Sequence, residues 1–150
     1  MAQWDEITAA VGVALGGDQA AGRQQLMRCW TETTEADHAQ RCVLAHYLAD
    51  LETDLEQEIV WDRAALAEHA LVEDEDLAPV GIASARGMAP SLHLNLGDGY
   101  LRRGEVEAAR DHLEQGLAAA EALPPEGYGK MIRSGLEGLA QRIEAVSKEA

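Results

Sequence analysis

Helical periodicity is the feature of this sequence that most constrains its fold. Apolar residues recur at helical spacing along most of the chain, as Ile7, Val11 and Leu15 do in the first segment. Glycine and proline interrupt this pattern, whereas no stretch alternates cleanly between apolar and polar residues as a strand would. The pattern predicts an all-α protein with seven helices, at residues 5–15, 19–30, 35–50, 55–71, 90–103, 106–123 and 129–147.

The breaks between these segments are short, with one exception. Short turns favour antiparallel neighbours, so we expect a series of helical hairpins. Thr34 is expected to cap the third helix, with Asp37 three residues further on. The exception is 72–89, an irregular acidic insert that contains the run 73–76. After this insert, Pro90 can open a helix at its first turn.

Length and composition suit a single folded domain. The chain has 150 residues, of which 47% are hydrophobic, so its composition is not that of a disordered protein. No apolar run approaches the roughly 20 residues of a membrane span, and the first residues lack the pattern of a signal peptide. We therefore expect a cytoplasmic protein without membrane contact. Arginine far outnumbers lysine and alanine is abundant, a bias associated with GC-rich bacterial genomes.

The negative charge is concentrated in the first half of the chain. The formal net charge is -15; residues 1–85 carry 17 acidic and 4 basic residues (-13), and 86–150 carry 10 acidic and 8 basic residues (-2). Such a surface repels phosphate backbones, which argues against nucleic-acid binding. It can steer a basic protein or peptide toward the chain, or it can serve only to keep the protein soluble.

One 34-residue segment, 90–123, carries a repeat pattern. Its elements are Leu96-Gly97, Tyr100, Ala109 and Leu113. This spacing resembles the tetratricopeptide repeat, with Leu113 in place of an aromatic residue and His93 where the family often has Trp. Gly104 lies at the turn between the two helices of the segment, as the repeat pattern expects.

The same offsets recover two weaker units, at 1–34 and 38–71. The insert 72–89 interrupts the array, and the helix at 128–148 resembles the capping helix that closes such stacks. The resemblance therefore implies one tetratricopeptide-like domain over 1–150, in the form of a short right-handed solenoid.

The resemblance implies a scaffold that binds a peptide or partner protein in a concave groove. Helix geometry places eight candidate residues in that groove: His38, Cys42, His46, Ser91, Leu94, Asn95, Asp98 and Arg102. Asn95 is the most suggestive, because an Asn at this place in peptide-binding members often bonds the backbone of the ligand. A homodimer also remains open.

A metal-binding or metal-sensing protein is the alternative hypothesis. His38, Cys42 and His46 follow at i, i+4 and i+8, which places them on one helix face. Histidine and cysteine are good ligands for zinc or copper. The row spans about 12 Å along the helix, so a metal would use two of its members with His93 as a further ligand. The other interpretation of Cys42 is a small buried residue.

No motif in the sequence indicates an enzyme or a cofactor. There is no P-loop, no G-x-S-x-G turn and no G-x-G-x-x-G after a strand. The two cysteines, Cys29 and Cys42, form no CxxC pair. We therefore expect a non-enzymatic protein without a bound cofactor.

The two hypotheses differ in a measurable way. If the histidines and Cys42 bind a metal, zinc or copper should raise the melting temperature, because a ligand that binds only the native state stabilises it. Differential scanning calorimetry with and without each metal makes the comparison. An unchanged melting temperature would leave only the scaffold hypothesis.

Overall fold

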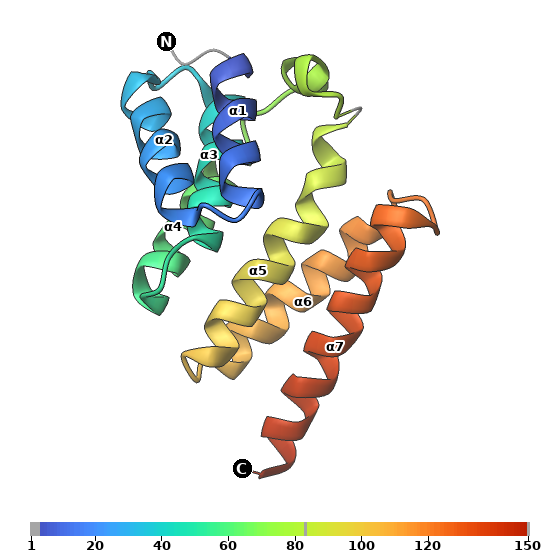
Figure 1. Cartoon of the computed structure of the whole chain (residues 1–150). Coiled ribbons are helices and arrows are strands. Elements are labelled where there is room, and N and C mark those ends of the chain that lie inside the picture. Colours follow the sequence, from blue (N-terminus) through green and yellow to red (C-terminus); the bar gives the residue numbers. More distant parts are fainter. Residues whose placement is uncertain (1–3, 83, 150) are drawn as a thin grey trace. The chain divides into compact units, whose positions relative to one another are not determined.

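The computed structural model describes residues 4–82 and 84–149, and it confirms an all-α fold without strands in those ranges. The helices, coloured from blue to red along the chain in Figure 1, are α1 (Trp4–Leu15), α2 (Gln19–Glu32), α3 (His38–Asp50), α4 (Leu55–His69), α5 (Ala89–Arg102), α6 (Val106–Ala120) and α7 (Gly127–Glu149). Two 3-10 helices, η1 (Asp74–Val80) and η2 (Ala85–Met88), lie between α4 and α5. No helix among the described residues is long and apolar enough to cross a membrane.

The chain divides into two compact units, Met1–Ala85 (unit 1) and Arg86–Ala150 (unit 2). The sequence predicted one domain, with an irregular insert at 72–89. That insert contains η1, η2 and the boundary between the units. The charge asymmetry follows the same boundary, since unit 1 carries -13 and unit 2 carries -2.

Unit 1 consists of the helix pairs α1–α2 and α3–α4. Aspartates begin two of these helices, because a side-chain carboxylate can accept a bond from an amide of the first turn. Asp18 accepts from the Ala21 amide at the start of α2, and Asp54 accepts from the Gln57 amide at the start of α4. Both helices begin at the residues that the sequence predicted, Gln19 and Leu55.

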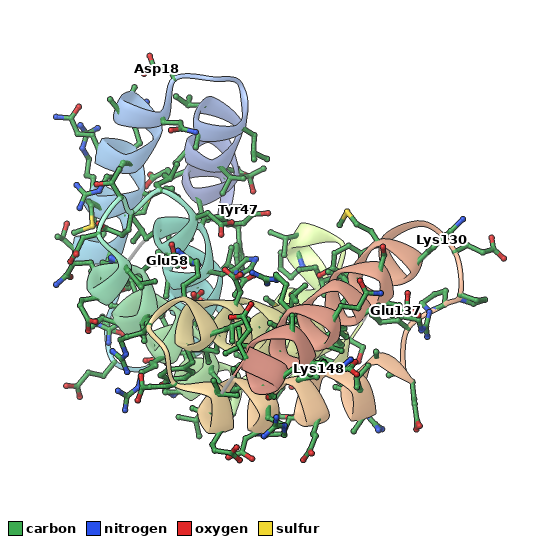
Figure 2. All side chains as sticks on the ribbon, turned by 90° about the horizontal axis from the view of Figure 1, so that it is seen from below. Asp18, Tyr47, Glu58, Lys130, Glu137 and Lys148 are labelled. Atoms are coloured by element: carbon green, nitrogen blue, oxygen red, sulfur yellow. The ribbon has the colours of Figure 1, made fainter. Side chains whose placement is uncertain are left out.

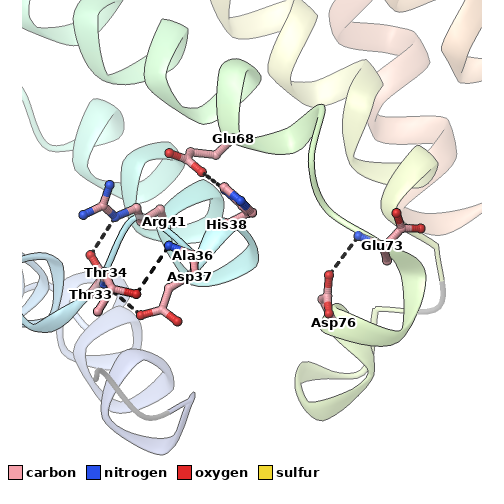
Figure 3. A network of polar contacts seen from close by, with 9 residues as sticks. All are labelled: Thr33, Thr34, Ala36, Asp37, His38, Arg41, Glu68, Glu73 and Asp76. Carbon is pink, nitrogen blue, oxygen red and sulfur yellow. Dashed lines mark hydrogen bonds and ion pairs between the residues drawn. The ribbon is translucent and has the colours of Figure 1, made fainter.

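The predicted start of α3 was wrong by about one turn. Thr34 and Asp37 do bond to one another, as the Thr34 amide donates to Asp37 Oδ2 at 2.9 Å. The Thr34 hydroxyl accepts a bond from the Ala36 amide, also shown in Figure 3. These bonds close a turn before the helix, and α3 begins only at His38. Thr34 and Asp37 therefore do make side-chain bonds to nearby amides, but these bonds stabilise the turn that precedes the helix.

In unit 1, small residues bring α1 and α2 close together, and an aromatic pair joins α2 to α4. A Cβ atom at Gly22 would lie 2.5 Å from Ala14 Cβ, so α1 and α2 cross where no larger residue fits. Trp30 of α2 and Trp61 of α4 meet edge to face, with ring centroids 4.9 Å apart. Glu52 accepts a bond from Trp61 Nε1 at 3.2 Å, which satisfies the polar end of that ring.

Unit 2 consists of the α5–α6 hairpin with α7 packed on both of its helices. A Cβ atom at Gly97 would lie 2.6 Å from Leu139 Cδ2 of α7 and 3.4 Å from the Ala109 carbonyl oxygen of α6. The three helices therefore meet around this glycine. Gly104 has a φ of 86°, a left-handed conformation that lets the chain turn between α5 and α6.

One core cluster of unit 2 is formed by aliphatic residues from α6 and α7. The buried members are Ala109, Leu113, Ala120, Ile132, Leu136, Leu139 and Ile143. The opposite side of α7 is charged, with Lys130 and Lys148 near its ends and Glu137 between them, all exposed (Figure 2). This division into an apolar and a charged side is typical of a helix with one face toward water.

Arg133 holds the beginning of α7 to the end of α6. Its guanidinium donates to the carbonyl oxygens of Ala120, Leu123 and Pro124 at 2.6–2.7 Å. One arginine of α7 thus bonds to the last carbonyl of α6 and to two carbonyls of the turn that follows it.

Two glycines of α7 should respond in opposite ways to alanine. A Cβ at Gly129 would overlap the Pro124 carbonyl oxygen, whereas nothing lies within 4 Å of the Cβ position at Gly138. We expect Gly129→Ala to destabilise the protein by about 1–3 kcal/mol through overpacking. Gly138→Ala should stabilise it by about 0.5–1 kcal/mol, because alanine loses less backbone entropy in a helix.

Urea unfolding of both variants, followed by far-UV circular dichroism, measures the two effects against each other. A Gly129→Ala protein as stable as Gly138→Ala would contradict the close α6–α7 turn.

Candidate functional site

The predicted row on α3 lies in three different environments. His38 Nδ1 lies 2.6 Å from Glu68 Oε2 of α4, as Figure 3 shows, and its side chain is 31% exposed. Cys42 has no exposed surface. His46 is half-buried, and its ring meets Tyr47 edge to face at 5.3 Å. The row therefore includes a partly exposed ring that contacts a carboxylate, a fully buried thiol and a half-buried ring.

Burial controls the acid–base properties of this row. Burial, and secondarily the Glu68 carboxylate, raise the pKa of the Cys42 thiol to about 12. Burial lowers the pKa of His46, while the Asp50 carboxylate acts in the opposite direction. Asp50 has a raised pKa for the same reason, opposed by His46. Cys42 is thus an inert thiol in the folded protein, so its predicted place in an open groove was wrong.

The described residues contain no group of three His, Cys, Asp or Glu side chains that could hold a metal ion. His38 is bonded to Glu68, and the protonated thiol of Cys42 is a poor ligand because metals bind the thiolate. The geometry therefore offers no observation in favour of the metal hypothesis.

His93, the fourth metal candidate, lies in the α5–α6 hairpin. Its Nδ1 atom is 3.1 Å from Nδ1 of His112, and the two rings stack with centroids 5.3 Å apart. Tyr100 also stacks on His112, with ring centroids 5.5 Å apart, and Arg103 Cζ lies 5.3 Å from the centroid of the Tyr100 ring. Sequence reasoning missed His112. The available signal was its position next to Leu113, on the part of α6 that the repeat pattern turns toward α5.

The predicted residues of α5 divide between the interior and the surface. Ser91 is 8% exposed and donates its hydroxyl to the Met88 carbonyl oxygen, so it lies inside the unit. Leu94 is packed toward α7, since a Cβ at Gly135 would lie 2.7 Å from Leu94 Cδ2. Asn95 is half-buried. Ser91 and Leu94, which were predicted to line a groove, therefore contribute mainly to the packing of unit 2.

Asp98, Arg102 and Arg142 form an ion-pair cluster, which we call the Asp98 cluster. Asp98 Oδ2 lies 2.9 Å from Arg102 Nη2, and Oδ1 lies 2.7 Å from Arg142 Nη2. The three side chains are 31%, 41% and 50% exposed, in chain order. One carboxylate thus orients two arginines from α5 and α7 at the surface. Sequence reasoning found Asp98 and Arg102 but missed Arg142, which lies 44 residues away from Asp98.

Two carboxylates of the acidic run 73–76 accept hydrogen bonds within unit 1. The Glu73 amide donates to Asp76 Oδ2 at 2.9 Å (Figure 3), in a reciprocal capping box at the start of η1. Asp74 Oδ1 accepts a bond from the Ala85 amide at 2.7 Å. These bonds order the loop, and an open hollow of about 440 Å³ lies beside it. Its lining residues are Asp74, Glu75, Ala78, Gly81 and Ile82.

A scan against protein-family models finds no match for the chain, and searches of curated proteins and of solved structures find no similar protein. The function is therefore inferred from the residues and their geometry.

The burial of Cys42 has a chemical consequence. We expect a thiol reagent such as DTNB to leave Cys42 unmodified in the native protein at neutral pH, because the thiol has no exposed surface and is protonated. Cys29, 5% exposed with a pKa also raised by burial, should react slowly as well.

Mass spectrometry of the labelled protein distinguishes the two sites. In guanidinium chloride both thiols should react, which controls for the reagent. Rapid native labelling at Cys42 would contradict the packing of α3.

Proposed function

We propose that this chain is a non-enzymatic protein–protein interaction module that binds a peptide or partner protein along α5. The observation that carries the proposal is the Asp98 cluster, in which two arginines are held at the surface by one carboxylate. Held arginines lose less side-chain entropy on binding than flexible ones do, and each guanidinium has five N–H donors. Such a pair suits the backbone carbonyls or acidic side chains of a partner.

The packing of unit 2 supports its likeness to a tetratricopeptide hairpin. Gly97 lies where α5 crosses α6 beside Ala109, and Gly104 turns the chain between them. Leu96 and Leu113 are buried, as the repeat pattern expects of its large apolar positions. In that interpretation Asn95, one turn before the Asp98 cluster, belongs to the same binding surface.

The charge of unit 1 favours a partner that is basic over part of its surface. Unit 1 carries -13, and several of its acidic groups are exposed, among them Asp5, Glu6 and Glu35. Such a field accelerates the encounter with a basic protein and is screened by salt. The two free cysteines, Cys29 and Cys42, fit a reducing compartment such as the cytoplasm.

Two substitutions on α5 test the proposed surface. We expect Asn95→Ala and Arg102→Glu each to weaken partner binding by about tenfold or more, because central interface residues carry most of the binding energy. Gln115→Ala, exposed on α6, is the matched control and should bind as the wild type does.

Affinity capture from cell extract, followed by titration of the captured protein in calorimetry, measures the effect. Circular dichroism checks that each variant is folded. Recovery of the same partners at the same affinity with both α5 variants would overturn the proposed surface.

A further inference from the structure

The side chain of Arg41, on α3, is held in one orientation by two neighbours within unit 1. Its Nε atom donates to the Thr33 hydroxyl at 2.9 Å, and its Cζ atom lies 5.1 Å from the centroid of the Trp30 ring, a cation–π distance. Thr33 is 9% exposed, and its hydroxyl donates in turn to the Trp30 carbonyl oxygen at 2.6 Å. A buried hydroxyl and an aromatic ring therefore set the plane of the guanidinium.

The Trp30 ring that Arg41 contacts is itself held in place. Trp61 meets this ring edge to face, with centroids 4.9 Å apart, and Trp61 Nε1 donates to Glu52 Oε1 at 3.2 Å. Arg23 Nη2 lies 3.0 Å from the same carboxylate oxygen. These contacts join α2, α4 and the turn between α3 and α4. Arg41 therefore rests on a connected part of unit 1, and its orientation does not depend on α3 alone.

The two terminal nitrogens of Arg41 are left open for a ligand. They carry four N–H groups, and none of these has a hydrogen-bond or ion-pair partner among the residues that the structure describes. Neither nitrogen is buried, and Figure 3 shows both directed away from the other labelled side chains. Two carboxylates drawn in the same view have other partners: Asp37 Oδ2 accepts from the Thr34 amide, and Glu68 Oε2 lies 2.6 Å from His38 Nδ1.

The charge of unit 1 decides which ligand this guanidinium can take. Its planar fork of N–H donors matches a carboxylate or a phosphate, which it can bind with two parallel bonds. Unit 1 carries -13, however, so it repels a free anion or a polyanion and attracts a basic protein segment. A ligand that satisfies both conditions is a basic segment that carries a single carboxylate.

We propose that Arg41 is a second binding site of this protein, which takes the carboxylate of an Asp or Glu side chain in an otherwise basic partner segment. Thr33 and Trp30 are its positioning residues. The paired bonds fix the register of the segment, because a lysine or arginine placed at Arg41 meets a like charge. The site lies in unit 1, whereas the proposed surface on α5 belongs to unit 2, so either can fail without the other.

The probe is a set of short lysine-rich peptides in which each position in turn is either Glu or Gln. Their binding to the full chain is measured by fluorescence anisotropy. The field of unit 1 favours the Gln member of every pair, because that member carries one negative charge fewer. Tighter binding of a Glu member therefore reports a local contact with a cation and cannot arise from the net charge.

We expect at least one Glu peptide to bind the wild type about fivefold or more tightly than its Gln counterpart, as charge-assisted hydrogen bonds would produce. Arg41→Gln should remove this preference for Glu. Arg41→Lys should weaken it, because an ammonium keeps the charge but lacks the planar fork. Thr33→Val should weaken it as well, although the arginine and its charge remain, because the hydroxyl that orients Arg41 is lost.

Arg63→Gln is the matched control, since Arg63 is an exposed arginine of α4 in the same unit and its substitution changes the net charge equally. This variant should keep the preference for Glu. Circular dichroism checks that each variant is folded. An equal preference in Arg41→Gln and Arg63→Gln would overturn the site.

A measurement on the wild type alone does not depend on the folding of any variant. The Nε–H resonance of Arg41, assigned through its own backbone, should shift when the preferred Glu peptide is titrated and stay in place with its Gln counterpart.

Three further outcomes would overturn the site. The first is the lack of any preference for Glu in the wild type, an absence of binding included. The second is an Arg41 resonance that does not move at saturation with the Glu peptide. The third is loss of the preference in Arg102→Glu, which would assign the contact to the α5 surface of unit 2.

Discussion

Close approach between helices at glycine and alanine is the constraint on which both units depend. In unit 1 the α1–α2 pair closes where Gly22 meets Ala14, and in unit 2 three helices converge around Gly97. A methyl group at either glycine would have to displace an atom of a buried neighbour, and interiors packed at crystal density leave little room for that. These small residues therefore allow the helices to approach closely, and the larger side chains of each unit pack around these points of contact.

The polar pair inside the hairpin is a consequence of the same constraint. The Cβ position of Gly116 lies 3.3 Å from His93 Cβ, and that of Gly97 lies 3.7 Å from His112 Cβ. Each histidine thus stands opposite a glycine on the facing helix, which gives the two rings room to stack. The two imidazoles brought together in this way have their Nδ1 atoms within hydrogen-bond distance of one another.

Local sequence accounted well for the helices and poorly for some of their ends. Helices α2 and α4 begin at the predicted residues, and Asp18 and Asp54 cap them through bonds from amides three residues further on. Thr34 and Asp37 show the limit of that reasoning, since the same residue types close a turn ahead of the helix. The predicted insert contains two short 3-10 helices, ordered partly by the bond between Asp74 and the distant Ala85 amide.

The sequence by itself determined an all-α chain, the approximate position of each helix, and a charge asymmetry that coincides with the two units. These follow from periodicity, capping and composition, which act over a few residues or need no spatial partner. Only the tertiary structure decided that Cys42 is inert, that Asp98 binds Arg142, and that His93 faces His112. Those outcomes depend on burial and on contacts between residues 19 and 44 positions apart, which the packing of whole helices creates.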